Sequence, residues 1–180
     1  MSLAPPEFMP SGWPVVERGL MMGYVGAVLV VRIGAVLPKE GFDRYIDEWT
    51  RSVDARPRDC AVFALYDVPV WPGMTPVQRK HWSMMLKSRE DVLRRTTRGM
   101  VMASTSPIAR GCARALFWLA PPPYPTAVVD TPRAAFAHLA PLGGPWAEGA
   151  LAAFDGLVAR YARATERGPS IPPERSARRT

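Results

Sequence analysis

Short, uninterrupted apolar runs alternate along the chain with stretches in which apolar residues recur every three or four positions. The runs have the length of buried strands, and the periodic stretches have the spacing of amphipathic helices. The runs predict five strands, at residues 20–24, 27–33, 60–66, 100–104 and 126–130. The periodic stretches predict helices at residues 39–53, 76–95, 107–119, 132–139 and 146–161.

The spacing also predicts which side of each helix is buried. In the first helix the predicted core residues are Phe42, Tyr45, Ile46, Trp49 and Val53. In the third they are Ile108, Cys112, Ala115, Leu116 and Leu119. The long second helix carries an apolar stripe that is interrupted once, at Arg89, and Gly99 is predicted to end it.

The predicted order is strand, strand, helix, strand, helix, strand, helix, strand, helix, followed by one further helix. Strands that alternate with helices indicate a mostly parallel sheet with right-handed crossovers. The short connection between the first two strands allows them to pair antiparallel. We therefore expect an α/β fold whose mixed, mostly parallel sheet has about five strands.

The 180 residues are the length of one ordinary domain. We expect a flexible segment at 1–13, the domain at 14–141, an appended C-terminal helix at 142–166 and a disordered tail at 167–180. The stretch 121–125 (PPPYP) is predicted to be a rigid connector, because it cannot form a helix or a central strand.

The stretch 19–37 is the one transmembrane candidate, but Arg32 and four glycines interrupt it. A charged residue inside a bilayer is costly, so two strands are the better interpretation. The chain has two cysteines, Cys60 and Cys112, which fits a reducing compartment. The first eight residues lack the features of a signal peptide, and we expect a cytoplasmic protein.

Over residues 14–141 this pattern resembles the STAS fold of anti-sigma-factor antagonists and sulfate-transporter cytoplasmic domains. It is most similar to bacterial STAS-like proteins grouped with the sporulation antagonist. The resemblance is carried by residues 31–34, the helix with Tyr45, Ile46 and Trp49, the strand that ends at Asp67, residues 110–119 leading into 121–125, and residues 131–139. It implies a regulatory protein-interaction module of the STAS fold, with the loop after Asp67 as part of the partner-binding face.

In phosphorylated members of that family a serine follows the aspartate and is read by a partner kinase and anti-sigma factor. Here Asp67 matches the aspartate, but Val68, Pro69 and Val70 stand in place of the serine motif. Thr75, at the start of the next predicted helix, is a candidate phosphoacceptor. The competing interpretation, which we favour, is that Thr75 is only a helix N-cap.

Positive charge is concentrated in one part of the chain. The net charge is +7, and residues 79–114 contain nine basic and two acidic residues, whereas the rest is balanced. Such a stretch is either a solvated face or a surface for an acidic protein, nucleic acid or anionic lipid. No DNA-reading motif accompanies it. The candidate partner-binding residues are Asp67, Trp71, Thr75, Arg79, Lys80, Arg94, Arg110 and Arg114.

The sequence shows no catalytic or metal-binding motif. Cys112 is flanked by Arg110 and Arg114, which favours a thiolate, but its place in the predicted apolar stripe indicates a buried, inert thiol. Trp82 and Trp118 are predicted to be core residues. Trp71, in the loop after Asp67, is either an exposed binding anchor or a lid over the core.

We therefore expect a protein with no catalytic residue, metal or cofactor. The primary hypothesis is an interaction module that binds an acidic protein through the 67–75 loop and the basic helix after it. The alternative is a small-molecule or lipid carrier with an apolar pocket, and an enzyme using Cys112 is a third. A homodimer and an anionic ligand or lipid are left open as partners.

Overall fold

The computed structural model describes residues 6–10, 12–17, 19–34, 37–69, 75–119, 121–142 and 148–166. Its strands are β1 (Val15–Glu17), β2 (Leu20–Val25), β3 (Val28–Ile33), β4 (Val62–Asp67), β5 (Thr97–Ala103) and β6 (Thr126–Val129). Its helices are α1 (Lys39–Asp54), α2 (Pro76–Ser88), α3 (Glu90–Thr96), α4 (Pro107–Leu119), α5 (Pro132–Leu139) and α6 (Glu148–Glu166), with a short 3₁₀ turn at Ala140–Leu142.

The six strands form one mixed sheet in chain order, β1-β2-β3-β4-β5-β6. The first three strands pair antiparallel and the last four pair parallel, which confirms the predicted α/β class and mixed sheet. The five predicted strands are all present. The edge strand β1 was not predicted, because its three residues are too few to produce an apolar run.

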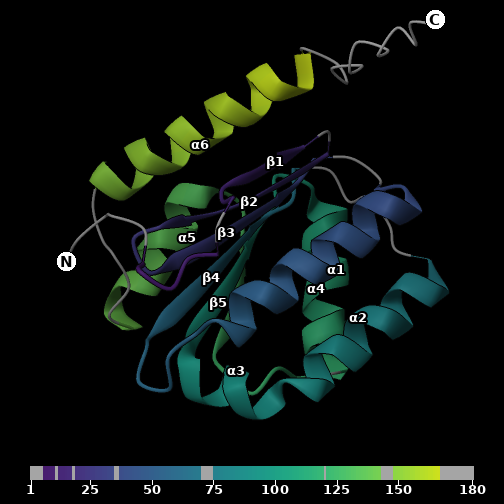
Figure 1. The fold of residues 1–180 in the computed structure, drawn as a ribbon. Coiled ribbons are helices and arrows are strands. Elements are labelled where there is room, and N and C mark those ends of the chain that lie inside the picture. Colours follow the sequence, from purple (N-terminus) through teal and green to yellow (C-terminus); the bar gives the residue numbers. More distant parts are fainter. Residues whose placement is uncertain are drawn as a thin grey trace, which may run out of the picture.

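The sheet is covered on both faces (Figure 1). Along β3, Leu29 and Val31 pack with α1, whereas Val28 and Val30 face the core shared with α5 and α6. Burial on both faces explains why the strands appear in the sequence as uninterrupted apolar runs rather than alternating ones. The predicted core residues of α1, from Phe42 to Val53, are all buried.

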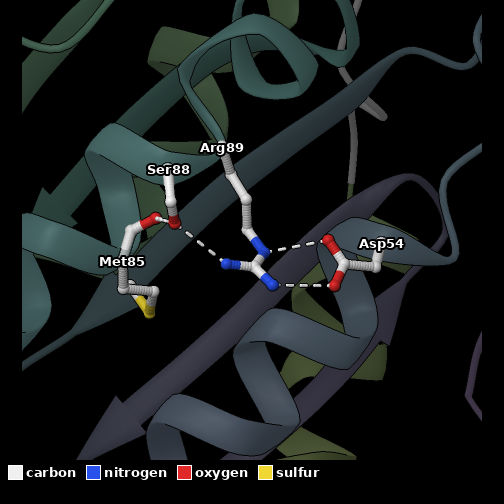
Figure 2. Close-up of polar contacts among 4 residues, drawn as sticks. All are labelled: Asp54, Met85, Ser88 and Arg89. Atoms are coloured by element: carbon white, nitrogen blue, oxygen red, sulfur yellow. Dashed lines mark hydrogen bonds and ion pairs between the residues drawn. The ribbon is translucent and has the colours of Figure 1, made fainter.

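The predicted helix 76–95 is two helices, because the chain bends at Arg89, where φ is −121° and ψ is 14°. The Arg89 guanidinium donates to both Asp54 carboxylate oxygens, at 2.8 and 2.9 Å, and to the Ser88 hydroxyl at 3.0 Å (Figure 2). Ser88 in turn donates to the Met85 carbonyl. This network attaches the junction of α2 and α3 to the end of α1.

Gly99 does not end the helix, contrary to the prediction, because β5 already begins at Thr97 and Gly99 lies within it. The glycine allows close packing instead. A Cβ atom at this position would come within 2.9 Å of a Leu142 methyl group. The 121–125 connector contains no helix or strand, as predicted.

The C-terminal helix α6 packs on the face of the sheet opposite α1 (Figure 1). Phe154 and Leu157 of α6 are buried. The ring of Phe154 packs edge to face on the ring of Phe136 of α5, with the two ring centroids 6.1 Å apart. Residues 142–166, which were predicted as an appended helix, therefore include a helix that shares one hydrophobic core with α5 and the sheet.

Phe154→Ala should lower the free energy of unfolding by about 3–5 kcal/mol, because it removes a buried aromatic side chain and leaves a cavity. Urea unfolding followed by circular dichroism measures the effect. The matched control is Asp155→Ala, an exposed neighbour on the same helix, which should change stability by no more than about 0.5 kcal/mol. Equal effects of the two substitutions would show that α6 does not stabilise the core.

Candidate ligand-binding site

Asp67 and Arg32 are register partners at the carboxyl ends of β4 and β3, and their side chains form an ion pair. Asp67 is 5% exposed, and burial raises the pKa of its carboxyl group, an effect that the Arg32 guanidinium opposes. The Tyr161 ring of α6 lies 5.8 Å from the guanidinium carbon. Asp67, a predicted partner contact, is thus an interior residue whose carboxylate is engaged with Arg32.

Thr75 is the N-cap of α2, as predicted. Its hydroxyl accepts from the Gln78 backbone N–H at 3.2 Å, and the Gln78 amide oxygen accepts from the Thr75 N–H at 2.9 Å. This reciprocal pair is a capping box, and Pro76 at the first helical position strengthens the start. Trp71, the other candidate in this loop, lies outside the described residues.

Two of the candidate basic residues have roles within the fold. Arg110 donates to the backbone carbonyls of Ser104 and Thr105, at 2.7 and 3.1 Å, and so fixes the turn between β5 and α4. Arg94 pairs with Glu90 one helical turn away on α3. An exposed pair of this kind contributes a few tenths of a kcal/mol.

The other candidate basic residues, Arg79, Lys80 and Arg114, are exposed on α2 and α4. These two helices contain no acidic residue. Of the eight predicted contacts, one is thus buried, one lies outside the described residues, and the rest lie on α2, its N-cap, α3 and α4.

An apolar cavity of about 110 Å³ lies between the sheet and helices α1, α2 and α4. An apolar pocket is one of the alternatives that the sequence suggests, but no local pattern identifies its walls, because they come from segments far apart in the chain. The residues that line the cavity are Ile33, Leu37, Phe42, Tyr45, Tyr66, Val68, Gln78, Trp82, Met100, Met102, Ala113, Leu116 and Phe117.

The aromatic polar groups at the wall are already hydrogen-bonded to one another. The Trp82 indole donates to the Tyr45 hydroxyl at 3.1 Å, and the Trp49 indole donates to the Tyr66 hydroxyl at 2.9 Å. Burial raises the pKa of Tyr45 to about 12 and that of Tyr66 well above its ordinary value. Both phenols are therefore neutral at physiological pH.

Gln78, the remaining polar lining residue, is held in the capping box with Thr75. Among the described residues, the buried side-chain atoms without a hydrogen-bond partner belong to Tyr24, Arg32, Ser52 and Arg56, none of which lines the cavity. The cavity wall thus offers mainly hydrocarbon and aromatic contacts, and each of its polar side chains already makes a hydrogen bond.

Helix α4 is turned differently from the prediction. It buries Ala109 and Ala113, which pack with Val68 and Met102, whereas Ile108, Trp118 and Leu119 are 75%, 82% and 72% exposed. The predicted core stripe is therefore wrong for this helix, as is the predicted burial of Trp118. The small side chains of Ala109 and Ala113 allow the helix to approach the sheet closely. The face with the larger apolar side chains has the same helical spacing, so periodicity alone does not show which of the two faces is buried.

The two cysteines also differ from each other. Cys112 is exposed on α4, which contradicts its predicted burial, and Cys60 is half-buried. Burial raises the pKa of the Cys60 thiol. The part of the chain that the structure describes contains no group of three His, Cys, Asp or Glu side chains able to hold a metal ion.

No protein-family model, curated protein or solved structure matches the chain. Among the described helices, none combines the length and the hydropathy that a bilayer span requires.

Arg32→Met should lower the free energy of unfolding by about 3 kcal/mol near pH 7, because the buried Asp67 carboxylate loses its counter-ion. The deficit should be smaller near pH 4. The pKa of Asp67 is raised in the folded state, so protonation of this carboxyl group stabilises the fold at low pH, and this stabilisation is lost as the pH rises through that pKa. A protonated Asp67 carries no charge and needs no counter-ion. Urea unfolding at both pH values measures the difference.

The double variant Arg32→Met/Asp67→Leu replaces both charges by apolar groups and should recover most of the lost stability near pH 7. If Arg32→Met lowered the free energy of unfolding equally at both pH values, the loss of stability would not come from the charge of Asp67.

Proposed function

We propose that the protein is a non-catalytic binding module that holds the hydrocarbon chain of a lipid-like ligand in the cavity beneath α1, α2 and α4. The observation that carries this proposal is the wall of the cavity, which is largely apolar and whose polar side chains each already make a hydrogen bond within the fold. A polar or charged ligand group would lose its water there without gaining partners. A hydrocarbon chain loses no hydrogen bonds on entering.

The size of the cavity is compatible with such a ligand. A dry cavity of about 150 Å³ in another protein holds one benzene molecule. The 110 Å³ here is of the same order and accommodates a short segment of an unbranched chain. Leu116 lines the cavity and is also 36% exposed, so the remainder of a longer ligand would leave beside α4.

Ala113→Leu should abolish most of this binding, because the added carbons occupy the cavity from its α4 wall. We expect the affinity for dodecanoate, measured by isothermal titration calorimetry below its micelle concentration, to fall by about tenfold or more. Because Ala113 also packs closely with Val68 and Met102, the longer side chain should lower the free energy of unfolding by about 1–3 kcal/mol, and circular dichroism checks that the variant remains folded.

The matched control is Ala115→Leu, the same change at an exposed position of the same helix, which should bind dodecanoate like the unaltered protein. Undiminished binding by Ala113→Leu would place the ligand elsewhere and overturn the proposal.

The second candidate is the interaction module expected from the sequence, which would bind an acidic protein through the exposed cations of α2 and α4. It is favoured by the absence of acidic residues from both helices. Reversal of Lys80, Lys87 and Arg114 to glutamate should abolish binding of a polyglutamate peptide, measured by fluorescence anisotropy, because the attraction becomes repulsion.

The control carries the same change in net charge on the opposite side of the sheet, at Arg133, Arg160 and Arg163 of α5 and α6. Equal loss in both triple variants would indicate an effect of total charge rather than a surface on α2 and α4.

We also propose that the fold is STAS-like. The support is the antiparallel β2–β3 hairpin followed by parallel strands in chain order with intervening helices, which is the element order on which the resemblance rests.

A further inference from the structure

Helix α4 carries a row of apolar side chains that the described part of the chain leaves exposed. Ile108, Cys112, Leu116 and Leu119 are separated by four, four and three residues, so they lie along one side of the helix. Trp118 extends the exposed apolar surface beside them. The row spans about 16 Å, from the rise of 1.5 Å per residue. Bulky side chains exposed together in this way mark an interaction surface.

The charged residues of α4 and of α2, the two helices that line the cavity together with α1, have one sign. Helices α2 and α4 together contain five basic residues and no acidic one, and Lys80, Lys87 and Arg114 are exposed. An occupant of this surface must therefore accept apolar side chains and supply negative charge. A bilayer with anionic headgroups does both, since headgroups attract Lys and Arg while Trp and aliphatic side chains enter the boundary below them.

We propose that α4 docks on the surface of an anionic phospholipid bilayer, with Trp118, Leu119 and Ile108 inserted at the headgroup boundary. The row reaches the cavity at Leu116, which belongs to both. If the cavity holds a lipid chain, as proposed above, that chain passes between bilayer and cavity along α4 without crossing water. Only this route rests on the proposed function, because docking itself does not require a loaded cavity.

The test is co-flotation of the full chain with vesicles. We expect binding to vesicles of equal parts phosphatidylcholine and phosphatidylglycerol, little binding to phosphatidylcholine alone, and weakening by salt. Trp118→Ser and Leu119→Ser should each weaken binding by about tenfold, the value for one buried apolar side chain. The control Leu142→Ser, an exposed leucine that follows α5, should bind normally.

Cys112 gives an independent readout from within the row. It is exposed, whereas burial raises the pKa of the Cys60 thiol, so a maleimide dye at neutral pH should react with Cys112 first. An environment-sensitive dye at Cys112 should shift to shorter emission wavelength with the anionic vesicles and not with phosphatidylcholine alone.

Two results would overturn the proposal. One is absence of flotation with anionic vesicles at low salt. The other is a dimer in solution that Trp118→Ser dissociates, since the row would then be covered by a second copy of the chain. Two outcomes separate docking from ligand binding. If Ala113→Leu floats with the vesicles but does not bind dodecanoate, docking does not depend on the cavity. If the unaltered protein binds dodecanoate but does not float, only the cavity proposal is supported.

Discussion

The order of the parallel strands determines where every helix can lie. Because β3 to β6 follow one another across the sheet in chain order, crossovers of one hand place all the connecting helices on the same face. A parallel sheet needs both faces buried, so the other face must be covered by chain outside these crossovers. Helices α5 and α6 do this, through Phe136, Phe154 and Leu157. The C-terminal helix thus supplies part of the cover that the topology of the sheet requires.

The cavity results from the way α2 is attached. Helix α1 buries a continuous aromatic and aliphatic face, whereas α2 has a single fully buried residue, Met85. Trp82 and Leu86 are only partly buried against the core, and polar contacts add to their packing: the indole of Trp82 bonds to Tyr45, and Arg89 binds Asp54 at the far end of α2. A helix fixed by contacts with its neighbouring helix rather than by close packing on the sheet leaves space beneath it. The hydrogen bond between Trp82 and Tyr45 and the ion pair between Arg89 and Asp54 hold α2 over this space.

Much of the fold could be predicted because strong local patterns agree with the tertiary structure. The runs for β2 to β6 and the buried face of α1 are examples, as is the cap at Thr75. The prediction was wrong where two faces of one element are both apolar. On α4 the sheet selects Ala109 and Ala113 for close approach, a choice that depends on the distance between two layers. The cavity is unpredictable for a similar reason, since it exists only where α1, α2, α4 and the sheet fail to fill the space between them.

The distribution of charge limits how a ligand could be recognised. The buried pair of Arg32 and Asp67 faces α6, on the opposite side of the sheet from the cavity, so it cannot select a headgroup there. Inside the cavity the tyrosines are neutral and already bonded. Discrimination between ligands by hydrogen bonding is therefore confined to the outside, where the exposed cations of α2 and α4 lie. The proposed binding of a lipid-like ligand would therefore depend on the shape and length of its chain inside the cavity and on its charge only at the surface.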